Sequence, residues 1–114
     1  MVRGTTPTHI FYTEINLEDI DKVFVTYKQG KNIVVEKTIE DVEINVEEKY
    51  ISVYLTQEET LRFKDKNWTY LYPNQNTKDE KVKVQVRLKY TNGDTAASNI
   101  ILLDVDDILK DGEI

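Results

Sequence analysis

The stretch of sequence that decides the fold is Lys81–Val105, KVKVQVRLKYTNGDTAASNIILLDV. Apolar and polar residues alternate through its first arm, residues 81–90, which is the period-two pattern of a strand with one buried and one solvated face. Asn92-Gly93 follows, and this pair favours a two-residue type I′ turn, because both central residues of that turn have positive φ. Residues 81–105 are therefore predicted to form a long β-hairpin.

The turn also sets the register that we expect for this hairpin. Counting outward from the turn places Val86 opposite Asn99. The residues of the second arm that are expected on the buried face are Ala97, Ile101, Leu103 and Val105. Ile100 and Leu102 then point away from the core, so either a further layer covers that face or these residues contact a partner chain.

Five further stretches show the strand pattern, namely residues 8–13, 22–28, 33–38, 42–46 and 50–55. Thr56-Gln57-Glu58-Glu59 matches a capping box and predicts one short helix from Thr56 to about Phe63. About seven strands joined by short turns predict an all-β fold, a single immunoglobulin-like antiparallel β-sandwich. We expect this domain to span residues 1–114, with residues 1–7 as a loosely held N-terminal arm. A small barrel is the structural alternative.

The composition narrows the classes of function. The 114 residues carry a formal net charge of -6, which argues against non-specific binding to nucleic acid or to an anionic membrane surface. No cysteine is present, so a disulfide scaffold and a thiolate metal site are excluded. The chain shows neither an apolar run of transmembrane length nor the pattern of a signal peptide, and we expect synthesis in a cytoplasm.

The residues that carry chemistry form no catalytic or metal-binding pattern. His9 is the single histidine, and no second histidine or cysteine exists to complete a metal site with it. The acidic residues near the C-terminus lack the spacing of a calcium-binding EF-hand loop. Neither a phosphate-binding glycine loop nor a nucleophile elbow occurs. The sequence therefore predicts a protein that is not an enzyme and that has no cofactor.

The side chains most suited to binding are aromatic. Trp68, Tyr70 and Tyr72 alternate along a stretch that precedes the hairpin. On an extended backbone they project to one side and form a strip of the kind enriched in protein interfaces. A sugar-stacking platform is a second functional interpretation, and a cover over the open edge of the sandwich is a purely structural one. Together with Ile100 and Leu102, these three residues are the predicted partner-binding site.

Three blocks of sequence carry a family resemblance. They are RGTTPTH at residues 3–9, LTQEETL at residues 55–61 and DILKDGEI at residues 107–114. In these blocks the chain resembles a family of small proteins encoded by bacteriophages and prophages of Gram-positive bacteria. The resemblance implies a virion or tail-associated protein, made in the host cytoplasm and then incorporated into the particle. It brings no functional residues with it.

Two classes of function follow as expectations. The first is a structural or interaction module of the phage particle, which binds other phage structural proteins or copies of itself as a homo-oligomer. The second is a small acidic phage inhibitor that binds a host defence protein, with a charge surface like that of nucleic acid. The first is favoured, because acidic residues are interspersed with lysines along the strands, whereas a nucleic-acid mimic gathers them on one face.

Overall fold

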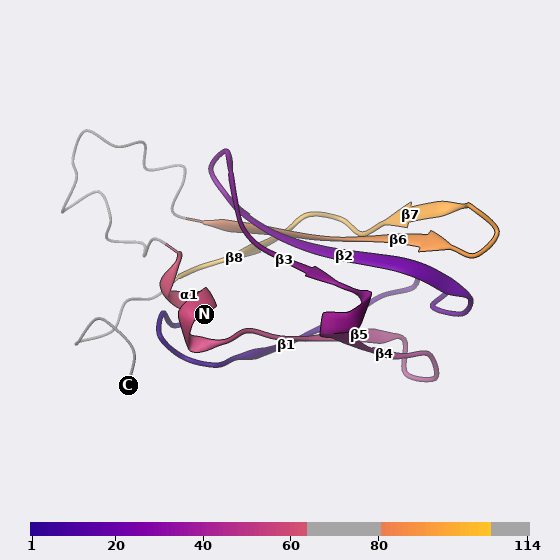
Figure 1. Ribbon diagram of the computed structural model, residues 1–114, viewed down its shortest axis with the longest axis horizontal. Coiled ribbons are helices and arrows are strands. Elements are labelled where there is room, and N and C mark those ends of the chain that lie inside the picture. Colours follow the sequence, from indigo (N-terminus) through magenta and orange to yellow (C-terminus); the bar gives the residue numbers. More distant parts are fainter. Residues whose placement is uncertain (64–80, 106–114) are drawn as a thin grey trace.

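The computed structural model describes residues 1–63 and 81–105 of the chain. Two antiparallel sheets pack face to face, and one short helix lies at one end of the pair (Figure 1). The first sheet has the strand order β1-β5-β4, and its strands are β1 Thr8–Tyr12, β4 Val42–Asn45 and β5 Tyr50–Tyr54. The predicted all-β sandwich is therefore confirmed.

The second sheet has five strands in the order β3-β2-β6-β7, with β8 also pairing with β6. Its strands are β2 Ile20–Gln29, β3 Asn32–Thr38, β6 Val82–Tyr90, β7 Thr95–Ala97 and β8 Ile101–Leu103. A turn of 3-10 helix, η1 Ile39–Asp41, carries the chain from β3 to the first sheet. Both strand orders are those of an immunoglobulin-like sandwich, in which one sheet is formed by strands B, E and D and the other by C′, C, F and G.

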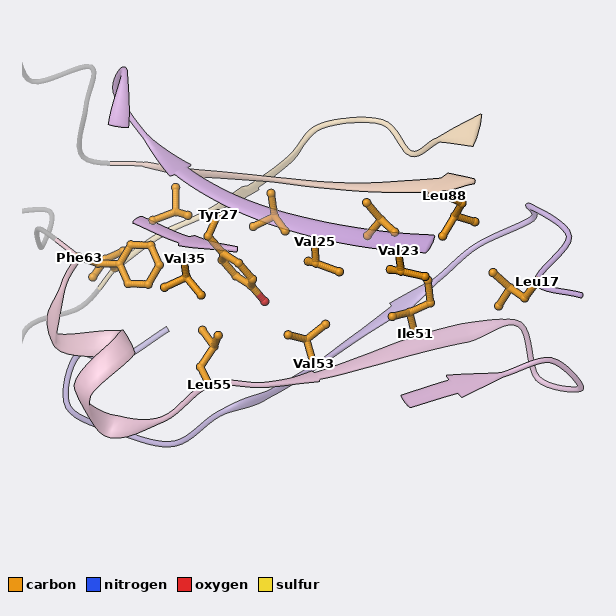
Figure 2. Packing of buried hydrophobic residues seen from close by; sticks show 14 residues of the cluster. Leu17, Val23, Val25, Tyr27, Val35, Ile51, Val53, Leu55, Phe63 and Leu88 are labelled. Atoms are coloured by element: carbon orange, nitrogen blue, oxygen red, sulfur yellow. The ribbon is translucent and has the colours of Figure 1, made fainter. Parts of the chain in front are cut away.

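The core lies between the sheets, where the alternating apolar residues of both inner faces meet (Figure 2). Its fully buried members include Val25 and Tyr27 from β2, Val53 from β5 and Val84 from β6. Phe63, which follows the helix, packs its ring against that of Tyr27 with centroids 6.1 Å apart. Alternate residues of each strand point into this core, and the residues between them form the outer faces of the two sheets.

The tip of the closing hairpin differs from the sequence prediction. The Tyr90 backbone N–H donates to the Asp94 carbonyl at 2.8 Å, and the Gly93 N–H donates to the Tyr90 carbonyl at 3.0 Å. Gly93 has φ +95°, whereas Asn92 does not have positive φ. The loop therefore contains three residues with a glycine bulge, and the predicted two-residue type I′ turn is wrong. As a result Lys89, and not Tyr90, lies opposite Thr95.

A second irregularity restores the predicted register farther along the hairpin. The Ser98 N–H donates to the Val86 carbonyl at 2.8 Å, and the Ser98 hydroxyl accepts from the Val86 N–H at 3.0 Å. One extra residue then separates β7 from β8, so Val84 pairs with Ile101 as predicted. The prediction was wrong for Ala97, which lies opposite Arg87 and is exposed, because the three-residue loop shifts the register by one between the turn and the irregularity at Ser98.

The start of the chain is hydrogen-bonded to the helix α1 Gln57–Leu61, whereas the sequence predicted a loosely held arm. Arg3 donates through its guanidinium to the carbonyls of Phe63, at 2.7 Å, and Leu61, at 3.1 Å. The Thr60 hydroxyl accepts from the Gly4 N–H at 3.0 Å. These bonds satisfy carbonyls at the helix end that have no partner within the helix. The predicted capping box is confirmed, with Thr56 as the N-cap.

Candidate interaction surfaces

The outer face of the five-stranded sheet presents its side chains in rows that cross the strands. One row consists of Ile33, Lys28, Lys83 and Leu102, each directly opposite the next on β3, β2, β6 and β8. Its two ends are apolar and largely exposed, with 59% of Ile33 and 56% of Leu102 accessible to solvent. Apolar side chains therefore flank a central pair of lysines.

Two further rows continue the pattern toward the hairpin tip. Phe24 on β2 lies opposite Arg87 on β6, and Lys22 lies opposite Lys89. Phe24 is 37% exposed, so one edge of an aromatic ring is available beside the guanidinium. Between these rows and the first, Thr26 lies opposite Gln85. The only carboxylate that the described strands place in these rows is Glu36, which lies opposite Thr26 on β3.

We call this surface the basic face. It is defined by the cations Lys22, Lys28, Lys83, Arg87 and Lys89 and by the exposed apolar residues Phe24, Ile33, Ile100 and Leu102. Within residues 1–63 and 81–105, none of these cations takes part in an ion pair. Lysines directly opposite each other on neighbouring strands repel, at a cost of about 0.2–1 kcal/mol for each such pair. The face therefore carries positive charge that the described fold does not neutralise.

The twist of the sheet makes part of the basic face concave. A shallow hollow of about 570 Å³ lies over β2, β3 and β6. Its lining includes Phe24, Lys28, Ile33, Arg87 and Ile100. The hollow is open and combines apolar walls with unpaired cations, which suits contact with a convex surface better than enclosure of a small ligand.

The outer face of the three-stranded sheet has a different character. Its exposed large apolar residues are Tyr12, Tyr54 and Ile10, of which 71%, 50% and 49% are accessible, and Thr8 and Glu43 are exposed on the same face. Tyr12 lies opposite Tyr50, and their rings meet edge to face with centroids 5.6 Å apart. The strands of this sheet have four or five residues each, so this tyrosine face is much smaller than the basic face.

The turns at the end of the sandwich opposite the helix are acidic. Figure 1 shows the β1–β2 connection, the β4–β5 turn and the β6–β7 turn at this end. Backbone hydrogen bonds join them, from Thr91 to Asp19 at 2.9 Å and from Thr13 to Lys49 at 2.9 Å. We call this region the acidic end, defined by Glu14, Glu18, Asp19, Glu47, Glu48 and Asp94. Tyr12 and Val46, which is 41% exposed, lie beside these carboxylates along the chain.

Polar groups inside the sandwich pair with each other. His9 on β1 and Tyr27 on β2 share a hydrogen bond of 2.7 Å between Nδ1 and the phenol oxygen. Burial lowers the pKa of His9, and the positive N-terminus lowers it further. Lys37 donates to Glu59 at 2.7 Å. Although burial opposes ionisation of Glu59, the bonds from Lys37 and from the Thr56 N–H hold its pKa below the usual value.

The bond between His9 and Tyr27 joins the two sheets, and the bond between Lys37 and Glu59 joins β3 to the helix. Among the residues that the structure describes, no group of three His, Cys, Asp or Glu side chains could hold a metal ion. Most of the C-terminal carboxylates lie at residues 106–113, outside the described chain. No helix in the described ranges is long and apolar enough to cross a membrane.

The predicted partner-binding residues divide into two groups. Trp68, Tyr70 and Tyr72 lie outside the described residues. Ile100 and Leu102 point away from the core, as predicted, and 59% and 56% of their surfaces are exposed. Their role in binding stays a prediction, but the structure places them on the same face as Phe24 and Ile33, beside the cations.

Sequence reasoning missed the basic face and the tyrosine face. The alternation along residues 22–28 did place Phe24 and Lys28 on the polar side of their strand. What it lacked was the pairing of β2 with β6, which are separated by more than fifty residues, and this pairing sets Lys28 opposite Lys83. Likewise, the expected interspersion of acids with lysines is wrong for the described strands, because the acids gather in the turns.

Comparisons of this chain with protein-family models, with curated proteins and with solved structures found no match.

Proposed function

We propose that this chain is a non-catalytic protein–protein interaction module and that it works as a virion or tail-associated component of a phage particle. The observation that supports an interaction module is the basic face, where more than half of the surface of Ile33, Ile100 and Leu102 is exposed. These residues expose apolar surface on both sides of the central lysines, and exposed apolar surface gathered on one face of a small domain is typical of protein contact sites.

The size of the apolar contribution decides how such a contact works. Full burial of an Ile or Leu side chain contributes about 1.5–3 kcal/mol, and covering the exposed half of three of them contributes roughly 3–5 kcal/mol. Association costs about 4–15 kcal/mol in lost freedom of motion. The apolar residues alone therefore give at most a weak contact, and the charges of the face or the presence of many copies have to add to it.

The phage setting rests on the resemblance of the three sequence blocks. Two of these blocks, residues 3–9 and 55–61, form one hydrogen-bonded unit, in which Gln57 donates to the Gly4 carbonyl at 2.9 Å and Thr60 donates to the Thr5 carbonyl at 2.8 Å. These bonds tie the N-terminus to the helix and lie away from the basic face.

The test is the composition of particles from a phage that encodes this chain. Mass spectrometry of purified particles is expected to find the chain in a fixed ratio to the other structural proteins. The variant Ile100→Ser with Leu102→Ser is expected to be absent from particles. Val2→Ser changes an exposed apolar residue away from the basic face, and this matched control is expected to be found in particles like the wild-type chain. Absence of the wild-type chain from intact particles would refute the phage part of the proposal.

The acidic end supports a second candidate, a phage inhibitor that binds a basic site on a host defence protein. Six carboxylates at one end of a small domain, Glu14, Glu18, Asp19, Glu47, Glu48 and Asp94, give a concentrated negative potential. This candidate requires a stoichiometric complex between monomeric chain and one host protein. It also requires that Glu47→Lys with Glu48→Lys abolishes this complex, while the Ile100→Ser with Leu102→Ser variant retains it.

A further inference from the structure

We propose that copies of this chain associate head to face, with the acidic end of one copy seated on the basic face of the next. This inference rests on the proposed interaction function and names the partner as a second copy.

The first step is the excess charge of the basic face. Two lysine pairs, Lys28 with Lys83 and Lys22 with Lys89, lie directly opposite each other on adjacent strands of the sheet. The chain as a whole is acidic, with a net charge of -6, yet these positions carry lysines. A carboxylate opposite each lysine would stabilise the sheet more than a second lysine does. The repulsion is relieved when an anionic surface covers the face. The basic face therefore fits a partner that presents carboxylates.

The second step is the apolar component, which decides the class of partner. Ile33 and Leu102 flank the lysines, and Phe24 is the single exposed aromatic residue that the described strands place on this face. Proteins bind single-stranded nucleic acid through successive aromatic rings on which the bases stack, and aliphatic side chains beside the cations do not provide this stacking. An acidic protein surface that carries apolar side chains satisfies both components of the face.

The acidic end of this chain is a surface of that kind. Glu47 and Glu48 follow Val46 in the β4–β5 turn, and Glu14 lies two residues after Tyr12. Tyr12 and Val46 are 71% and 41% exposed. The carboxylates and apolar side chains of the acidic end complement, in charge and polarity, the cations and apolar walls of the hollow that Phe24, Ile33 and Ile100 line.

The area of the basic face is sufficient for such a contact. Strand β2 has 10 residues, which corresponds to roughly 33 Å, and four neighbouring strands span roughly 15–20 Å. The face therefore offers on the order of 600 Å², close to the roughly 800 Å² that each partner buries in a standard interface. The tyrosine face, with strands of four or five residues, provides much less.

Charge also determines the symmetry of the assembly. A two-fold contact between two basic faces would set the same cations against each other, and a two-fold contact between acidic ends would do the same with carboxylates. The favourable pairing joins unlike surfaces, so it is heterologous, and a pair of copies keeps one free basic face and one free acidic end. Assembly therefore continues into an open chain or closes into a ring.

The test uses the purified full-length chain and two charge-reversal variants. Lys28→Glu with Lys89→Glu removes the basic face and converts both lysine pairs to Glu–Lys pairs, so the fold is not weakened. Glu47→Lys with Glu48→Lys alters the acidic end at exposed turn positions. Sedimentation velocity is expected to show that the wild-type chain associates progressively with concentration, whereas each variant alone is monomeric.

Mixing the two variants distinguishes a heterologous contact from a symmetric one. The first variant retains an acidic end and the second retains a basic face, so an equimolar mixture is expected to form one discrete heterodimer that does not extend further. Raising the salt from about 0.1 M to about 0.5 M reduces the Debye length from about 10 Å to about 4 Å and is expected to weaken the association at least tenfold.

Two matched controls carry the same changes of net charge at other sites. Lys31→Glu with Arg62→Glu and Glu40→Lys with Glu58→Lys are both expected to associate like the wild-type chain. The inference is overturned if the wild-type chain is monomeric at every concentration, if it forms a dimer that the variants leave unchanged, or if the mixed variants stay monomeric. Tighter binding of an oligothymidylate than of a second copy to the basic face overturns it in favour of nucleic acid.

These outcomes are separate from those of the proposed function. A chain that is found in particles but is monomeric when pure remains an interaction module and has a different partner on its basic face. If the chain assembles head to face but is absent from particles, the proposed role in the virion is refuted and the head-to-face contact stands.

Discussion

Replacing Lys28 by Glu is predicted to stabilise the fold, which is unusual for a substitution of a surface residue of a natural strand. Lys28 lies directly opposite Lys83 on the outer face of the sheet, and both side chains are exposed. Two ammonium groups about 7 Å apart repel by roughly 0.6 kcal/mol in water, and a carboxylate about 4–5 Å from an ammonium is attracted by roughly 0.9 kcal/mol. Screening at physiological salt reduces the sum of these values to about 0.5–1 kcal/mol.

The measurement is thermal and urea unfolding of the wild-type chain and of Lys28→Glu. For a domain of this size the gain corresponds to a rise in Tm of about 2–5 °C. Lys28→Gln, which removes the repulsion and adds no attraction, is expected to give less than half of the gain. Lys31→Glu, with the same change of charge in the β2–β3 turn, is expected to give none.

A double-mutant cycle identifies the pair as the source of the effect. Lys83→Glu alone is expected to stabilise as Lys28→Glu does, whereas the double variant sets two carboxylates opposite each other and is expected to lose both gains. In about 1 M salt, where the Debye length is about 3 Å, all of these differences are expected to vanish. A stabilisation that persists in high salt, or a Lys28→Glu chain less stable than wild type, would refute the electrostatic account of the basic face.

Three further predictions concern the interior, the helix start and the hairpin tip. Because burial lowers the pKa of His9, the unfolded chain binds more protons than the folded chain below a pH of about 6.5. The free energy of unfolding is therefore expected to fall as the pH drops below that value. Urea unfolding of the His9→Gln chain at the same pH values is expected to lack this decrease. Thr56→Ala removes the side-chain oxygen that accepts from the Glu59 N–H and is expected to cost about 1 kcal/mol in urea unfolding, while Thr56→Ser is expected to retain most of the stability. Gly93→Ala meets no atom within 4 Å but requires φ near +95°, so it is expected to lower the free energy of unfolding by about 1 kcal/mol, and an unchanged Tm would contradict the three-residue loop.

The fold could be predicted from sequence because its signals are local. Alternation of apolar and polar residues over five to ten positions identifies each strand, and the capping box at Thr56 identifies the helix start. The hairpin register is less local. The choice between a two-residue and a three-residue loop at Asn92-Gly93 depends on small differences in backbone energy. The irregularity at Ser98 is stabilised by the Ser98 hydroxyl, which accepts from the Val86 N–H, and the alternation of apolar and polar residues does not predict this bond.

The surfaces could be predicted only in part, because they are made by neighbours that are distant in the chain. The outward positions of Ile100 and Leu102 follow from alternation within one hairpin. The opposition of Lys28 to Lys83 follows from the pairing of β2 with β6, and the sequence between these two strands contains β3, two strands of the other sheet and the helix. A pattern read along one strand shows which side chains share a face of that strand, whereas the charge of a sheet face is a property of several strands at once.

The net charge of the chain does not determine which partners a local surface can bind. A formal charge of -6 argues against a chain that is basic overall, but a partner responds mainly to nearby charges, because the Debye length at physiological salt is only about 8 Å. A partner that covers Lys28 and Lys83 in the middle of the sheet therefore experiences mainly the cations of the basic face, whereas Lys22 and Lys89 lie near the hairpin tip, where the acidic end begins. Separation of the two kinds of charge allows one small acidic domain to present a positive surface and a negative surface together, and like-charge repulsion between identical faces then favours contacts between unlike surfaces of neighbouring copies.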